Sequence, residues 1–94
     1  LKERQEIYEK ALNVFGEKNQ FEMLQEEATE LALAARRFIR LDNDIYLQEV
    51  AKEIGDLKNM IEQIEMMFPG IENQIETQRQ NAIYKLEDLL KKRI

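Results

Sequence analysis

The sequence predicts an all-α protein, a four-helix subunit that forms a single domain over residues 1–94. Glycine and proline are scarce, with three and one in 94 residues, and charged residues make up 35% of the chain. Apolar residues recur three and four positions apart, which is the spacing of a buried helix face. No heptad runs cleanly through the chain, so a helical bundle is favoured over a long coiled coil.

The first predicted helix covers about residues 2–15, and Gly16 follows it where a glycine commonly ends a helix. The second begins at Asn19 or Gln20, with Asn19 as the expected N-cap, and runs to Arg40.

The third predicted helix follows the polar turn of residues 42–44, where either Asn43 or Asp44 can cap it. It continues to Met67 or Phe68, because the Pro-Gly pair after Phe68 stops a helix. The fourth covers about residues 71–92 and ends in a cationic run that suits a helix C-terminus. Its predicted inner side consists of Ile75, Ala82, Ile83, Leu86 and Leu90.

Composition excludes several classes of site. The chain has no histidine and no cysteine, which rules out disulfides, Cys/His zinc sites and Ser-His-Asp triads. The net charge of −5 argues against general binding to nucleic-acid polymers or anionic membranes. No apolar run reaches the roughly 18 residues of a membrane span, and a cytoplasmic protein is expected.

Two predicted helices carry carboxylates on their apolar faces. In the third helix, Glu53 falls inside the apolar stripe and Asp56 lies at its edge. That stripe consists of Val50, Ile54, Leu57, Ile61, Ile64 and Phe68. In the second helix, Glu27 and Glu30 project on the side of Met23, Leu31, Ala34 and Phe38, with Glu26 at the margin. Antiparallel packing would bring four carboxylates together, and divalent cations would relieve their repulsion.

The ligand chemistry favours Mg²⁺, with Mn²⁺ as the alternative, because carboxylate oxygens suit hard cations. Di-iron bundles need Glu-x-x-His, which this chain cannot supply. Mg²⁺ usually shares its coordination with substrate phosphates, so an all-carboxylate site indicates phosphate chemistry. In the competing interpretation the chain is a non-catalytic helical adaptor. The same carboxylates would then pair with Arg36, Arg37 or Lys52 and bind no metal.

E-E-x-x-E at Glu26, Glu27 and Glu30, followed by E-x-x-D at Glu53 and Asp56, resembles the MazG-like nucleotide pyrophosphohydrolases of the all-α NTP pyrophosphatase superfamily. The local sequence E-I-G-D-L is close to the family's common E-L-G-D-L or E-L-A-D-V. The resemblance in layout covers nearly the whole chain.

The resemblance implies hydrolysis of a nucleoside triphosphate to the monophosphate and pyrophosphate, with Mg²⁺ as cofactor. It implies metal ligation by Glu27, Glu30, Glu53 and Asp56. Glu26 and Glu27 are the catalytic candidates, with Glu26 a ligand or the residue that orients the attacking water. Substrate phosphates would be contacted by Lys85, and secondarily by Arg79 and Lys58.

The resemblance also implies a dimer, or a tetramer built from two dimers, with the site near the subunit interface. The long apolar faces of the second and third helices independently predict at least a dimer. Met60 stands where several relatives carry an aromatic residue that holds the base, so base selection stays open. Phosphoribosyl-ATP, dUTP and dCTP hydrolysis are alternatives within the same fold.

Overall fold

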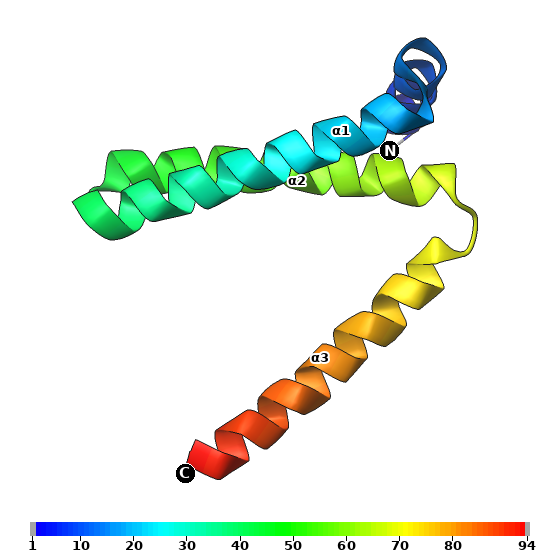
Figure 1. Ribbon diagram of the computed structural model, residues 1–94. Coiled ribbons are helices and arrows are strands. Elements are labelled where there is room, and N and C mark those ends of the chain that lie inside the picture. The colour runs from blue at the N-terminus through cyan, green and yellow to red at the C-terminus, as the bar shows by residue number, and fades with distance from the viewer. Residues whose placement is uncertain (1, 94) are drawn as a thin grey trace.

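The chain folds into helices without strands in the part that the structure, a computed structural model, describes, residues 2–93 (Figure 1). The helices are α1 (Lys2–Leu41), α2 (Asp44–Met67) and α3 (Ile71–Arg93). The all-α class is confirmed. Helices α1 and α2 lie side by side and antiparallel, and α3 leaves this pair at an open angle (Figure 1).

The count of four helices is corrected to three, because α1 continues through the boundary that the sequence predicts. Gly16 leaves the helical conformation, with φ 83° and ψ 163°, and the helix bends there. Glycine suits this backbone, since residues with a Cβ rarely adopt a positive φ. Asn19 does not act as an N-cap. Its side-chain amide donates instead to the carbonyl of Phe15 at 2.8 Å, which links the two sides of the kink.

The turn between α1 and α2 forms as the polar residues 42–44 indicate. Asp42 adopts a left-handed φ of 43°, and its N–H donates to the carbonyl of Phe38 at 2.9 Å. Asn43 is the N-cap of α2, because its Oδ1 accepts a hydrogen bond from the N–H of Ile45 at 3.0 Å.

Helix α2 ends at Met67, and Phe68 adopts an extended conformation. Gly70 takes a φ of 90°, and the N–H of Ile71 donates to the carbonyl of Phe68 at 3.1 Å. The ring of Phe68 packs on that of Phe21 in α1, with centroids 5.9 Å apart. This contact joins the end of α2 to the middle of α1.

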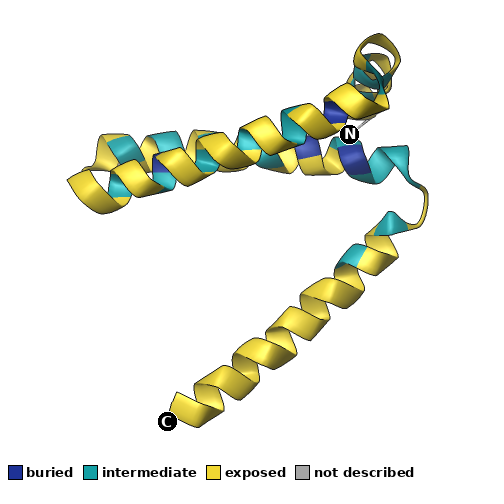
Figure 2. Cartoon of the chain, viewed as in Figure 1, coloured by how far each residue is buried: buried dark blue, intermediate teal, exposed yellow. Residues whose placement is uncertain are grey.

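The small core lies along the seam between α1 and α2 (Figure 2). Its apolar members are Ala34, Met60 and Ile64. The predicted stripe of α2 is split, because Ile54 and Ile61 are exposed and only the narrower face toward α1 is covered.

Helix α3 buries no residue, and only Ile71 and Ile75 at its start are half-buried. Its apolar side therefore meets no partner within the described part of one chain (Figure 2). The inner side predicted for the fourth helix is exposed, with Ile83 57%, Leu86 49% and Leu90 52% accessible. None of the helices within residues 2–93 has the length and apolar character needed to cross a bilayer.

Candidate metal centre

Helices α1 and α2 bring three of the four predicted metal ligands together across their seam. One carboxylate oxygen each from Glu27, Glu30 and Glu53 lies within 4.8 Å of the other two. The three-residue spacing of Glu27 and Glu30 places both on one side of α1. The antiparallel partner then presents Glu53 at the same level. We call these three residues the carboxylate cluster.

Asp56, the fourth predicted ligand, lies beside the cluster and is held by Lys52. The Nζ atom of Lys52 is 2.9 Å from Oδ2 of Asp56 and 3.3 Å from Oε1 of Glu53. Lys52 precedes Asp56 by one helical turn, so this pair is an i, i+4 contact along α2. No lysine or arginine within residues 3–93 forms an ion pair with Glu27 or Glu30.

Two oxygens of the carboxylate cluster are buried without a hydrogen-bond partner among the described residues. They are Oε2 of Glu27 and Oε2 of Glu53, and the Glu53 side chain is only 14% exposed. Leaving a buried polar group unpaired costs about 1–3 kcal/mol, and more for a charged group. Carboxylate oxygens in this situation are the donor set that a hard divalent cation prefers. The residues therefore fit Mg²⁺ or Mn²⁺.

Repulsion between the carboxylates raises the pKa values of two members of the cluster. Burial raises the pKa of Glu27, and the negative charges of Asp56 and Glu53 raise it further. The negative charge of Glu27 raises the pKa of Glu30, as does a hydrogen bond with Glu53. Hydrogen bonds to Asp56 and Glu53 raise the pKa of Lys52, which therefore stays cationic. Lys52 thus offsets part of the negative charge.

An open surface pocket of about 310 Å³ adjoins the cluster. Its wall is partly apolar and partly charged, with Glu30, Leu33, Ala34, Arg37, Glu49, Lys52 and Glu53 as lining residues. Arg37 forms an ion pair with Glu49 across the two helices. The pocket thus places two cationic side chains, Arg37 and Lys52, beside the carboxylates.

The remaining predicted site residues lie elsewhere. Glu26 is exposed on α1 next to the cluster, and its charge adds to the rise in pKa of Glu27 and Glu30. Lys58 is exposed about 140° round α2 from Glu53, on another side of the helix.

Arg79 and Lys85 are exposed on α3, which does not pack on the site of its own chain. Arg79 pairs with Glu76 of the same helix at 3.1 Å. One chain therefore does not bring these two cations to the carboxylate cluster.

Gln20 is a buried polar residue that the sequence interpretation missed. It is 0% exposed, and neither Nε2 nor Oε1 has a hydrogen-bond partner among the described residues. Helical spacing could have predicted this burial, because Gln20 precedes Glu27 by seven residues and so lies on the same face of the helix. The buried polar groups of the seam therefore extend two turns beyond the cluster.

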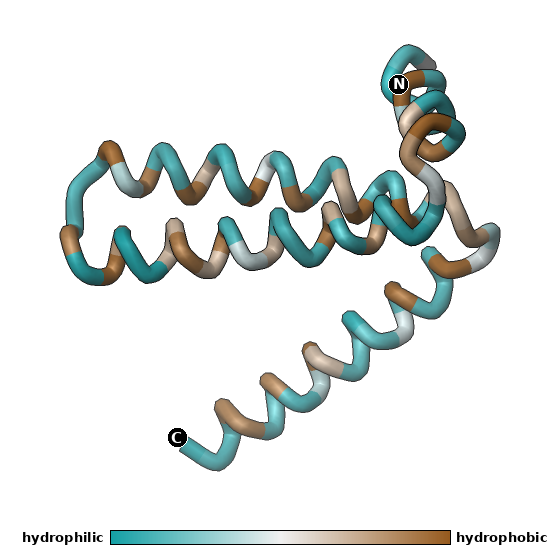
Figure 3. The backbone as a smooth tube through the Cα atoms, turned by 45° about the horizontal axis from the view of Figure 1, so that its top comes forward, coloured by the Kyte–Doolittle hydropathy of each residue, from teal (hydrophilic) through white to brown (hydrophobic). Residues whose placement is uncertain are grey.

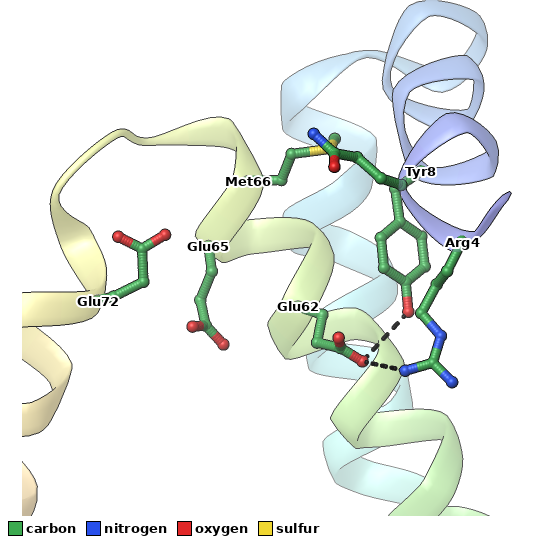
Figure 4. A pocket seen from close by; sticks show the side chains of 7 residues that line it. Arg4, Tyr8, Glu62, Glu65, Met66 and Glu72 are labelled. Atoms are coloured by element: carbon green, nitrogen blue, oxygen red, sulfur yellow. Dashed lines mark hydrogen bonds and ion pairs between the residues drawn. The ribbon is translucent and has the colours of Figure 1, made fainter. Parts of the chain in front are cut away.

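A second pocket, of about 330 Å³, lies where the start of α1 meets the end of α2 (Figure 4). Glu62 accepts hydrogen bonds there from Arg4 at 3.2 Å and from the Tyr8 hydroxyl at 3.4 Å. Burial and the nearby charge of Glu62 raise the pKa of Tyr8. These contacts hold the part of α1 before the kink against α2, which is a structural role.

Comparisons with protein-family models, with curated proteins and with solved structures find no match to this chain. The functional proposal consequently depends on the geometry of the cluster and on the sequence motifs.

Proposed function

We propose that this protein is a metal-dependent nucleoside triphosphate pyrophosphohydrolase, which releases pyrophosphate and a monophosphate from an NTP or dNTP. The main support is the carboxylate cluster. Three of its oxygens, one from each residue, lie within 4.8 Å of one another, and two carboxylate oxygens of the cluster are buried without a hydrogen-bond partner among the described residues. The resemblance of the E-E-x-x-E and E-x-x-D motifs to MazG-like enzymes supports the same activity.

Glu27, Glu30 and Glu53 would hold the ion. Asp56 would become a fourth ligand if its contact with Lys52 were replaced by a contact with the metal. When bound, Mg²⁺ or Mn²⁺ neutralises phosphate charge and lowers the pKa of the attacking water. Glu26 lies at the exposed margin of the cluster. From there it can accept a proton from water or orient it, as a general base does.

Phosphoryl-group chemistry depends mainly on positioning and charge neutralisation. Lys52 is suited to this, since it is 67% exposed and its ion pair with Asp56, itself 39% exposed, is open to solvent. Such pairs contribute only about 0.2–1 kcal/mol, so Lys52 can exchange a carboxylate for a substrate phosphate. Arg37 lines the same pocket. Lys85 and Arg79 can contact a substrate phosphate only if the α3 helix that carries them lies beside this pocket.

The adaptor interpretation draws support from one observation, the pairing of Lys52 with Glu53 and Asp56. That pairing leaves Oε2 of Glu27 and Oε2 of Glu53 buried without a hydrogen-bond partner among residues 3–93. The metal proposal accounts for these oxygens and the adaptor proposal does not.

The nucleobase is not assigned by the site. Met60 is 4% exposed and buried in the seam, so its side chain does not line the pocket beside the cluster. Phosphoribosyl-ATP, dUTP and dCTP hydrolysis therefore stay as alternative forms of the same reaction.

The first test is thermal unfolding with and without Mg²⁺ or Mn²⁺. Binding to the native state at a hundredfold excess over Kd stabilises a protein by about 2.7 kcal/mol, so the melting temperature should rise by several degrees. Glu22→Gln, an exposed change on α1, should retain the whole increase. A parent protein whose melting is unaffected by either ion would favour the adaptor. Screening nucleoside triphosphates for pyrophosphate release would then identify the substrate.

A further inference from the structure

Lys52 places its ammonium group against two of the four predicted metal ligands. Its Nζ atom lies 2.9 Å from Oδ2 of Asp56 and 3.3 Å from Oε1 of Glu53. The ammonium therefore supplies these two oxygens with hydrogen-bond donors and one positive charge. It does not reach the other side of the cluster, where Oε2 of Glu27 is buried without a hydrogen-bond partner among residues 3–93. Lys52 thus neutralises the cluster only from the side of α2.

The contacts of Lys52 are of a kind that exchanges readily. Its side chain is 67% exposed, and that of Asp56 is 39% exposed. The contact with Glu53 is 3.3 Å long, whereas charge-assisted hydrogen bonds are commonly about 2.7–2.9 Å. Both contacts lie within α2, so their loss does not separate α2 from α1. Lys52 can therefore leave the carboxylates without any change in the helix pair.

The pocket beside the cluster holds the place to which Lys52 can move. Lys52 lines this pocket together with Arg37 of α1. Arg37 is also held by a carboxylate, that of Glu49. Helix α3 diverges from the α1–α2 pair toward its C-terminus (Figure 3), so its cations do not border the pocket within one chain. A phosphate group in the pocket would thus meet cations from α1 and α2.

The cluster and Lys52 share Glu53, which makes Lys52 a competitor of any metal ion bound there. Glu53 contributes an oxygen to the group that lies within 4.8 Å, and its Oε1 accepts from Lys52. A divalent cation among these oxygens would lie close to the ammonium and repel it. A phosphate in the adjoining pocket would attract the same ammonium. Both forces act on Lys52 in the same direction.

We propose that Lys52 exchanges the carboxylates of Glu53 and Asp56 for a substrate phosphate when a divalent cation is bound, so that metal binding completes the phosphate site. The exchange rests on the proposed function, because it requires the metal site. Its flexible four-carbon side chain lets Lys52 change partner while the backbone stays in place. Metal and nucleotide should then bind with positive coupling, and each should raise the affinity of the other by the same factor.

A purely structural role of Lys52 predicts the opposite effect on the metal. If Lys52 only held Glu53 and Asp56 in position, its removal would loosen two ligands and weaken metal binding. If Lys52 competes with the metal, its removal strengthens metal binding. The direction of the change therefore separates the two roles.

Calorimetric titration of Mn²⁺ alone into the full chain measures this direction. Lys52→Met keeps the length of the side chain and its helix propensity but removes the charge. The variant should bind Mn²⁺ about 3–10-fold more tightly than the parent, because a competing cation is gone. Lys91→Met is the matched control. Lys91 is 71% exposed and pairs with Glu87 at the same four-residue spacing on α3, so its loss should leave Mn²⁺ binding unchanged.

A second titration adds a non-hydrolysable nucleoside triphosphate analogue to the Mn²⁺-saturated proteins. Lys52→Met should bind the analogue about tenfold more weakly than the parent, because one charged hydrogen bond to a phosphate is lost. Lys91→Met should bind it as the parent does. Circular dichroism should show unchanged helices in both variants, since both lysines are exposed.

Tighter Mn²⁺ binding together with weaker analogue binding by Lys52→Met supports the exchange. Unchanged or weaker Mn²⁺ binding by this variant, beside a parent that binds Mn²⁺, overturns the exchange and leaves the metal site intact. Tighter Mn²⁺ binding with unchanged analogue binding also overturns it, because the phosphate would then gain nothing from Lys52. A parent that binds no Mn²⁺ overturns both the exchange and the proposed function.

Discussion

At the scale of single residues, the carboxylates of the seam repel one another. Glu27 is partly buried, and its pKa is raised by that burial and by the charges of Asp56 and Glu53. Glu30 has a raised pKa mainly because Glu27 lies beside it. A fold keeps such a cluster at lower free energy when a cation satisfies it.

These raised values predict how metal-free stability depends on pH. Between the ordinary value of 4.5 and the raised pKa, the folded chain binds more protons than the unfolded chain. The free energy of unfolding therefore falls as pH rises through that window. Urea denaturation measures the free energy of unfolding at each pH. This free energy should fall less with rising pH in Glu27→Gln than in the parent. If the free energy of unfolding changed identically with pH in both proteins, repulsion at Glu27 would be excluded.

Saturating Mg²⁺ should remove most of this loss in the parent, because coordinated carboxylates are favoured in the ionised form. The same salt concentration supplied as NaCl is the control for general screening.

The sequence predicts part of this site for a simple reason. Helical periodicity alone places Glu27, Glu30 and Glu53 on inward faces, and the structure brings these three together. It does not predict how Lys52 divides its contacts between Glu53 and Asp56, because that depends on side-chain rotamers. The burial of Gln20 likewise depends on how the part of α1 near the kink packs against α2.

At the scale of the elements, local turn chemistry made most helix ends predictable. Asn43 caps α2, and the Pro-Gly pair ends it, because these residues act through their own backbone. The break at Gly16 was predicted as a helix end, but the hydrogen bond from Asn19 to Phe15 spans it. A side chain that bridges a kink is not visible in the spacing of apolar residues.

The kink predicts opposite effects of alanine at two glycines. Gly16→Ala should destabilise the protein by about 1–2 kcal/mol, the cost of a left-handed backbone with a Cβ. A Cβ at Gly16 would meet nothing within 4 Å, so the cost is conformational. Gly55→Ala is the control. It lies inside α2 with equal space and should stabilise by about 0.5–1 kcal/mol. Chemical denaturation measures both, and a neutral Gly16→Ala would show that the kink is not required.

At the scale of the whole molecule, most of the apolar side of α3 is uncovered within the described residues of one chain. The amphipathic pattern of α3 was predictable, but its partner was not, because an apolar stripe does not say which chain covers it. For the same reason, the sequence does not predict where Lys85 and Arg79 lie relative to the carboxylates. Assembly of two copies offers a way for α3 to lie against another chain's α1–α2 pair.

If a second copy of the chain brings α3 to the carboxylate cluster, Lys85→Ala should lower kcat/KM for the nucleotide by about tenfold or more, because it would remove a cation that contacts the substrate phosphates. Unfolding curves should not change, because Lys85 is exposed. Glu87→Gln, an exposed change on the same helix, is the control and should keep full activity. If α3 serves the partner's site, mixing Lys85→Ala with Glu53→Gln chains should restore activity. Unaltered kinetics of Lys85→Ala would exclude Lys85 from the site.

Calorimetric titration decides whether the carboxylate cluster holds a divalent cation. Mg²⁺ or Mn²⁺ is titrated into the parent and into Glu53→Gln, with a non-hydrolysable nucleotide analogue present. Gln keeps the shape of Glu53 and removes its charge. Changes to groups that only support a ligand weaken metal binding by about 10–100-fold, so loss of a direct ligand should cost at least as much. If the cluster holds the ion, the parent should bind it saturably and the variant should bind little or none. Equal binding by both proteins would contradict it.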